Sequence, residues 1–224
     1  MEAHPSKPNG RRTLWHELRD ILAFEIANGG QVSIINRLDR ETSGLTLVAK
    51  SHAAARTFHQ IMEQRGIEKE YLALVWGWPI HDEFTIEVPL LHQRDVEPFR
   101  IYLKQIGHPD GALASTRFKV ERRFSKATSN GDQFAIVRCF PKTGRMHQIR
   151  VHLSEYGHPI VGDKIYGPDE GCYLEFIETG WTDALARRLI LPRQALHSAA
   201  LHVAAHALSF KSPLPEDLAS WIKE

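Results

Sequence analysis

The densest group of reactive side chains in the sequence lies in one short polar turn, N-R-L-D-R-E-T-S-G at residues 36–44. Its single aspartate, Asp39, stands between Arg37 and Arg40. A nearby cation favours the ionised form of a carboxylate, which nucleophilic chemistry requires. Short β-prone runs at 31–35 and 45–49 flank the turn, so strands would fix both of its ends. A solvated turn with an ordinary ion pair has the same composition, and the turn alone leaves both interpretations open.

Two later segments carry further polar groups at defined spacings. The first, P-K-T-G-R-M-H-Q-I-R-V-H-L at residues 141–153, passes from a predicted strand through a glycine turn into a predicted helix. A helix start offers free N–H groups, and Lys142 and Arg145 beside it favour a phosphate, although a basic helix cap without a ligand looks the same. The second, G-H-P-I-V-G-D-K-I-Y-G at residues 157–167, is typical of a tightly shaped loop because of its glycines and proline.

These three segments resemble the RluA-type pseudouridine synthases, enzymes that convert selected uridines of RNA into pseudouridine. The signature turn of that family reads H-R-L-D-x-x-T-S-G-L, and its later motif reads T-G-R-x-H-Q-I/L-R-x-H-L, followed by G-H-P-I-x-G-D-x-x-Y-G. The segments K-E-Y-L-A-L-V-W-G at 69–77 and R-Q-A-L-H at 193–197 match the family as well. The resemblance therefore covers nearly the whole chain. One departure is Asn36, where the family usually has histidine.

The resemblance implies a catalytic site made of Asp39, Tyr71 and Arg150. Asp39 would act at C1′ of the ribose, through a covalent adduct or a glycal-type elimination, with Arg150 as its ion-pair partner. The target base must be flipped out of its helix, and Tyr71 would replace the lost stacking. No metal or other cofactor is required. The residues expected to bind RNA or shape the pocket are Arg37, Arg40, Lys69, Lys142, Arg145, His147 and Gln148.

The order of predicted elements favours an α+β fold with a mainly antiparallel mixed sheet, flanking helices and a central RNA-binding cleft. Helices are expected at 13–28, 51–66 and 147–156, and loops at 92–114, 125–132 and 167–193. Leu174, Phe176 and Ile177 suggest a short helix within the last of these loops. Strands are expected at 69–76, 84–90, 115–124, 134–140 and 196–210. The resemblance implies one pseudouridine synthase domain, residues 1–224, with no separate N-terminal RNA-binding domain. Because residues 1–5 match the family after its opening strand, that strand is expected to be absent.

Composition sets limits on partners and location. The net charge of +1 in 224 residues assigns binding of structured RNA, whether ribosomal or transfer RNA, to a local basic patch. Cys139 and Cys172 have no CxxC spacing, which fits a reducing cytoplasm and argues against a zinc site. No apolar run is long enough to cross a membrane. A cytoplasmic monomer is expected.

Three alternatives compete with the synthase interpretation. A metal-dependent hydrolase would use His202 and His206, but no glutamate accompanies them, and on a strand the two would lie about 13 Å apart. A serine or cysteine hydrolase lacks the G-x-S-x-G elbow. A catalytically impaired homologue that only binds RNA is the strongest of the three, although such a protein has no need for Asp39 in a site that attracts phosphate.

Overall fold

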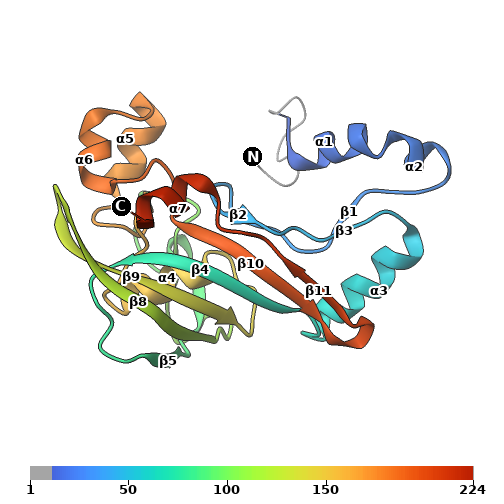
Figure 1. The fold of residues 1–224 in the computed structure, drawn as a ribbon, viewed down its shortest axis with the longest axis horizontal. Coiled ribbons are helices and arrows are strands. Elements are labelled where there is room, and N and C mark those ends of the chain that lie inside the picture. The colour runs from blue at the N-terminus through green and yellow to red at the C-terminus, as the bar shows by residue number, and fades with distance from the viewer. Residues whose placement is uncertain (1–11, 224) are drawn as a thin grey trace.

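A seven-stranded sheet forms the centre of the protein, whose computed structural model describes residues 12–223. The strand order is β11-β10-β4-β9-β8-β5, with β2 beside β10 (Figure 1). Only the pairing of β2 with β10 is parallel in this sheet, which confirms the α+β class. The expected chain start at residues 1–5 lies outside the described residues. The strands are β2 Ser43–Gly44, β4 Glu68–Trp76, β5 Glu83–Ile86, β8 Thr116–Thr128, β9 Gly131–Pro141, β10 Leu196–Val203 and β11 Leu208–Lys211.

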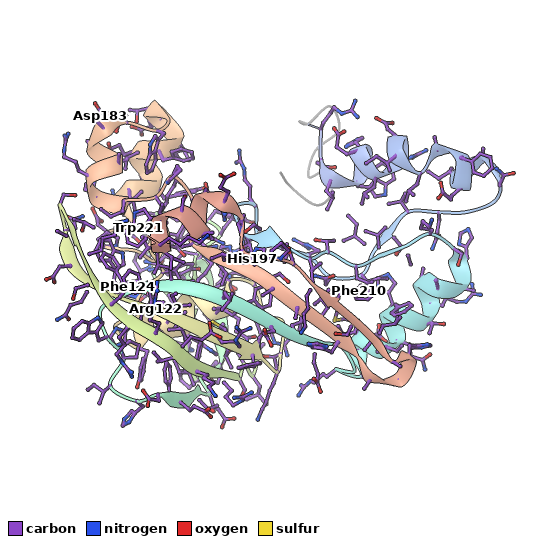
Figure 2. All side chains as sticks on the ribbon, viewed as in Figure 1. Arg122, Phe124, Asp183, His197, Phe210 and Trp221 are labelled. Atoms are coloured by element: carbon purple, nitrogen blue, oxygen red, sulfur yellow. The ribbon has the colours of Figure 1, made fainter. Side chains whose placement is uncertain are left out.

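The core lies between helix α4, Gln148–Glu155, and the strands whose residues alternate between buried and exposed. Along β8, Thr116, Phe118 and Val120 are buried and the residues between them are exposed, as expected for a sheet with one buried face. Helix α4 contacts β8 and β9, and its first six residues are all buried. At the other end, Trp221 of helix α7, Glu216–Lys223, packs edge-on against Phe124 and Phe134 (Figure 2).

Smaller elements surround this sheet. Strands β1 and β3 pair with each other, as do β6 and β7. Figure 1 shows α1 and α2 set apart from the central sheet, and α5 and α6 as a separate pair of helices at its opposite end. Their bounds are α1 Leu14–Ile21, α2 Ala23–Ala27, β1 Ser33–Ile34, β3 Val48–Ala49, α3 His52–Glu63, β6 Leu90–His92, η1 Gln93–Asp95, β7 Gln105–Gly107, α5 Gly171–Thr179, α6 Asp183–Leu189 and η2 Ala204–His206. No helix within residues 12–223 is both long and apolar enough to span a membrane.

Several predicted elements differ from the structure. The loop expected at 125–132 belongs mostly to the hairpin of β8 and β9, and the loop expected at 92–114 contains η1 and β7. The helix expected at 13–28 breaks at Leu22, and neither of its parts buries a residue, so its apolar face does not join the core. The single strand expected at 196–210 is a hairpin, because Ala207 turns the chain with a φ of 51°. The loop expected at 167–193 contains α5 and α6, of which only the first has a signal in the sequence.

The turn at 36–44 is attached to the sheet through β2. Leu45 N donates to Ser198 O, and Gly44 lies against the backbone of Ser198. A Cβ at Gly44 would lie 2.2 Å from that oxygen, and the φ of Gly44 is 110°. Only glycine fits both conditions. The turn is therefore fixed to β10, the neighbour of β4.

Candidate active site

The polar turn at 36–44, the family-like strand at 69–77 and the segment at 141–153 meet in one cleft of about 630 Å³. The turn at 36–39 forms one side, the start of β4 forms the floor through Lys69 and Tyr71, and residues 141–150 form the other side. These segments are far apart in the sequence, and the sheet order brings them together because β4 lies between β10 and β9. All of the predicted site residues except Arg40 line this cleft.

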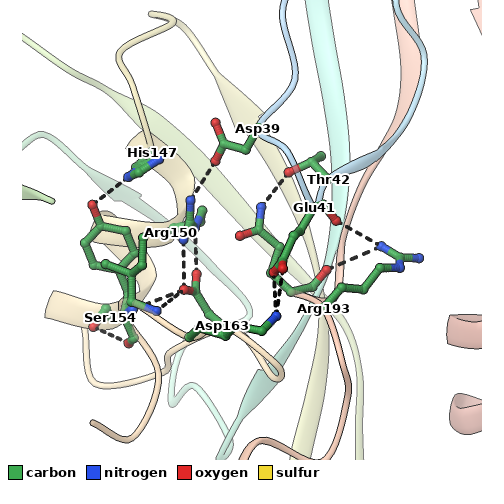
Figure 3. Close-up of polar contacts among 12 residues, drawn as sticks. Asp39, Glu41, Thr42, His147, Arg150, Ser154, Asp163 and Arg193 are labelled. Atoms are coloured by element: carbon green, nitrogen blue, oxygen red, sulfur yellow. Dashed lines mark hydrogen bonds and ion pairs between the residues drawn. The ribbon is translucent and has the colours of Figure 1, made fainter. Parts of the chain in front are cut away.

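Arg150 joins two carboxylates at the base of the cleft (Figure 3). Its Nη1 donates to Asp39 Oδ2 at 2.9 Å, and its Nε and Nη2 donate to the two oxygens of Asp163 at 2.7 and 2.9 Å. The Asp163 side chain is fully buried, whereas 27% of the Asp39 side chain is exposed. Asp39 is therefore the carboxylate of this group that a substrate can reach.

Asp163 fixes the orientation of the arginine. Its Oδ1 also accepts from the backbone N–H groups of Ile165 and Tyr166, at 3.0 and 3.1 Å. Burial by itself would raise the pKa of Asp163, but the charge and hydrogen bonds of Arg150 outweigh burial and lower that pKa. The carboxylate stays ionised, and its two-pronged contact leaves only Nη1 of the guanidinium to face Asp39.

Further contacts hold the rest of the turn. Lys164 Nζ, buried, donates to both oxygens of Glu41 at 2.7 and 2.8 Å, and Gln194 donates to Thr42 Oγ1 at 2.6 Å (Figure 3). Asn36 accepts from Leu47 N and donates to Leu45 O across the turn. Asparagine at the position where the family usually has histidine thus closes the turn through its amide.

Tyr71 and Lys69 project into the cleft from β4, two residues apart on the same face of the strand. Burial raises the pKa of the Tyr71 phenol to about 12, so the ring is neutral at physiological pH. Burial also lowers the pKa of Lys69. An aromatic ring and a half-buried amine therefore lie next to the Asp39 turn.

The cleft also has a basic rim, defined here as Arg37, Lys142 and Arg145. All three are exposed, and within residues 12–223 none of them forms an ion pair with a carboxylate. Arg145 makes one side-chain contact, from Nε to Leu113 O at 3.2 Å. Unpaired cations around a neutral aromatic ring suit a nucleic-acid strand, since phosphates can take the place of the missing carboxylates.

Comparison with known proteins gives this geometry a family. The family model described as RNA pseudouridylate synthase matches residues 2–155. The chain belongs to this family. The RluA-type resemblance read from the motifs is thereby confirmed.

Two bacterial relatives illustrate the similarity. The Ribosomal large subunit pseudouridine synthase C of Salmonella typhi is 45% identical over 141 residues, which cover 62% of this chain and 40% of that protein. The Ribosomal large subunit pseudouridine synthase D of Nitrosomonas europaea is 33% identical over 230 residues, covering 100% of this chain and 59% of that protein. The chain thus spans about half the length of these two relatives.

Solved structures show the same fold. Human RNA Pseudouridylate Synthase Domain Containing 4 superposes with a TM-score of 0.70 at 22% identity, covering 96% of this chain and 84% of that one. Human RNA Pseudouridylate Synthase Domain Containing 1 gives a TM-score of 0.67 at 24% identity, covering 94% of this chain and 84% of that one. The expected pseudouridine synthase fold is therefore confirmed.

Three of the predicted RNA-binding residues differ in how they are placed relative to the cleft. His147 lines the cleft, with its Nδ1 2.8 Å from the Tyr166 hydroxyl. The Gln148 amide is buried and bonded to Thr143 Oγ1 and Thr116 Oγ1, so it shapes the loop from inside. Arg40 lies outside the cleft, in a separate depression that is also lined by Glu41, Thr42, Ser43, Arg193 and Asp217.

The sequence interpretation missed the supporting residues Asp163, Lys164 and Tyr166. Each contacts a different part of the site: Arg150, Glu41 and His147 respectively. Their signal was an adjacent acid and base followed by an aromatic residue, inside a glycine-bounded loop of otherwise apolar residues. Burial of such charges requires partners, which points to a network. Among the described residues, no group of three or more His, Cys, Asp or Glu side chains is arranged to hold a metal ion.

Proposed function

We propose that this protein is an RNA pseudouridine synthase with Asp39 as its catalytic carboxylate. The observation that carries the proposal is the pairing of the partly exposed Asp39 with the buried Arg150 at 2.9 Å. The two residues stand 111 positions apart in the sequence and belong to the two motifs that are most specific to the family. The other carboxylate that contacts Arg150, that of Asp163, is fully buried. Asp39 is therefore the carboxylate assigned to the reaction at the sugar.

The reaction is an isomerisation that needs no oxidant or reductant. The bond between N1 of uracil and C1′ of the ribose breaks, the base turns, and a bond between C5 and C1′ forms. C5 then loses its proton and N1 gains one, so atoms and electrons balance. Asp39 serves as the carboxylate at the sugar, and the Arg150 cation favours its ionised form. The chemistry requires neither a metal nor a cofactor.

Tyr71 and the basic rim would hold the flipped nucleotide. Flipping costs a few kcal/mol, and stacking on an aromatic face returns about 1–3 kcal/mol. The neutral, buried Tyr71 ring on the cleft floor suits this stacking. Arg37, two residues before Asp39, would occupy the space that the base leaves, while Lys69, Lys142 and Arg145 would contact backbone phosphates.

The proposed substrate is structured RNA, either ribosomal or transfer RNA, with ribosomal RNA first because the two relatives above are named for the large ribosomal subunit. The proposal also includes a single catalytic domain spanning residues 1–224, a monomeric state and a cytoplasmic location. The net charge of +1 makes the unpaired cations of the cleft the source of RNA affinity.

Mapping of pseudouridines in cells tests this function. Carbodiimide-dependent stops of reverse transcription would be compared in total RNA from host cells with the gene, without it, and complemented by wild type or by Asp39→Ala. A uridine that is modified only with the wild-type gene identifies both the activity and the target. If no site is lost on deletion, the chain is a binding-only member of the family and the catalytic assignment of Asp39 is wrong.

A further inference from the structure

Tyr166 connects the cleft to strand β7 through two hydrogen bonds. The backbone N–H of Gln105 donates to the Tyr166 hydroxyl oxygen at 2.8 Å, and the same hydroxyl lies 2.8 Å from His147 Nδ1. The Tyr166 side chain is buried, with 6% of the residue exposed. In Figure 3 a dashed line from His147 marks its contact with this hydroxyl.

The direction of these bonds follows from the donors available. A backbone N–H can only donate, so the phenol oxygen accepts from Gln105 and its own hydrogen must go elsewhere. Burial raises the pKa of Tyr166, which keeps that hydrogen in place. Within the described residues, His147 Nδ1 is the one further hydrogen-bond partner of the hydroxyl. Since a buried O–H without an acceptor is unfavourable, the hydroxyl donates to Nδ1.

The ring of His147 is consequently neutral, with its hydrogen on Nε2. Burial, assisted by the charge of Arg150, lowers the pKa of His147 to about 4, so the ring carries one hydrogen near neutral pH. Because Nδ1 accepts, that hydrogen belongs to Nε2. No described residue hydrogen-bonds Nε2, and the side chain lines the cleft. The ring therefore has a free donor.

The backbone of His147 is held in an unfavourable conformation. Its φ is 56°, in the left-handed region, which is unfavourable for a residue with a side chain. The residue is the N-cap of α4, yet its side chain makes no capping bond. Strain of this kind persists where the surrounding structure enforces it, often at functional sites. Here it coincides with the placement of the imidazole in the cleft.

We propose that His147 Nε2–H donates a hydrogen bond to an oxygen of the target nucleotide, and that Tyr166 is the positioning residue that fixes this tautomer. The acceptor is a uracil carbonyl or a ribose hydroxyl, and this part of the inference rests on the proposed function. A neutral ring near Asp39 suits an uncharged oxygen, because phosphate would be repelled by that carboxylate. The cations of the basic rim are available for phosphate instead.

The tautomer can be measured in the free protein. Heteronuclear NMR of the imidazole nitrogens, with His147 assigned by comparison with His147→Gln, distinguishes a protonated from an unprotonated nitrogen at neutral pH. The expected result is a protonated Nε2 and an unprotonated Nδ1 in wild type, and a loss of this preference in Tyr166→Phe. Tyr156→Phe is the matched control, because its ring stacks on Phe84 and its hydroxyl makes no hydrogen bond to a described residue.

A protonated Nδ1 in the wild-type protein would overturn the inference, as would an unchanged tautomer in Tyr166→Phe. Neither result depends on turnover. The hydrogen-bonded chain from Gln105 through Tyr166 to His147 is therefore tested separately from the proposed function. An absence of turnover in the wild type, together with the expected tautomer, would count against the proposed function alone.

The donor role is then tested in single-turnover assays of tritium release from C5 of labelled ribosomal RNA transcripts. The amide nitrogen of glutamine can stand in for Nε2, whereas asparagine resembles Nδ1 in reach. His147→Asn should react about fivefold more slowly than wild type, the value of one neutral hydrogen bond, and His147→Gln should recover most of the rate. Equal rates for all three proteins would remove the donor from the mechanism.

Modified substrates distinguish the two acceptors. Transcripts with 4-thiouridine or 2-thiouridine weaken a carbonyl acceptor, and transcripts with 2′-deoxyuridine remove the hydroxyl. The substitution that abolishes the difference between wild type and His147→Asn identifies the oxygen that Nε2–H binds. If the difference persists with every modified transcript, neither oxygen is the acceptor and the proposed contact is wrong.

Discussion

The buried base and the exposed basic rim of the cleft use charge in opposite ways. Beneath the Asp39 turn, the Arg150 and Lys164 cations are buried and each is bonded to carboxylates. On the basic rim, the cations are exposed and have no carboxylate partner among residues 12–223. The first arrangement fixes geometry, because a buried charge without its partner is costly. The second leaves cations available for a ligand, because an exposed charge retains its hydration until the ligand arrives.

This difference separates catalysis from binding in the proposed enzyme. Changes beneath the turn should alter turnover or stability, with RNA affinity largely kept. Changes on the rim should alter affinity and its salt dependence, with turnover at saturation largely kept. Four predictions test this separation.

The largest effect is expected for Asp39→Asn, which keeps the shape of the side chain and removes its charge. Single-turnover tritium release should fall by at least about 10³-fold, because the carboxylate at the sugar is lost. RNA binding, measured by filter retention, should be unchanged or slightly tighter, since one repulsion toward phosphate disappears. Asp132→Asn, on the exposed start of β9, is the matched control. A parallel loss of binding in Asp39→Asn would contradict the separation.

The next effect is on stability. Arg150→Met leaves Asp163 buried without its cation and should lower the free energy of unfolding by about 3–5 kcal/mol, measured by urea denaturation. Adding Asp163→Asn removes that uncompensated charge and keeps an oxygen for the N–H groups of Ile165 and Tyr166. The double variant should regain most of the stability but not turnover, because Asp39 still lacks its partner. Recovery of both would show that Arg150 acts only as a packing residue.

The same contrast explains what the sequence could and could not predict. The rim residues and Asp39 stand in polar turns, and the composition of such a turn is visible in a short stretch of sequence. Nine of the ten predicted site residues line the cleft. Gln148 has the same type of sequence signal, but its amide is consumed by buried partners 5 and 32 residues away. A local motif cannot show such distant partners.

Contacts between residues far apart in the sequence also explain why some predictions were wrong or incomplete. The periodicity of residues 13–28 predicts a helix but not what covers it, and no residue of α1 or α2 is buried. Asp163 and Lys164 reach Arg150 and Glu41, and the second of these contacts spans 123 positions. The central strands β4, β8 and β9 were predicted close to their observed positions, because β4 is a continuous apolar run and the residues of β8 alternate between buried and exposed.

A third prediction concerns pH and stability. The pKa of His147 is lowered to about 4 from an ordinary value of 6.5, by burial first and by Arg150 second. Between pH 6.5 and about 4 the His147 ring binds more protons in the unfolded chain than in the folded protein. The stability that the neutral ring contributes is therefore complete above pH 6.5 and is lost as the pH falls toward about 4. The interval corresponds to about 3 kcal/mol. Urea denaturation across this range should show a steeper loss for wild type than for His147→Gln; parallel curves would contradict the burial of a neutral ring.

The smallest effects are expected on the rim. Lys142→Ala and Arg145→Ala should each weaken RNA binding by roughly three- to tenfold at low salt and reduce the salt slope by about 1, because each removes one phosphate contact. Turnover of the bound RNA should stay near the wild-type value. Arg40→Ala is the informative companion, since Arg40 lies in the separate depression with Arg193 and Asp217. An unchanged salt slope in Arg40→Ala would confine phosphate binding to the cleft, whereas a slope reduced as in the rim variants would extend the RNA path across the turn to its other face.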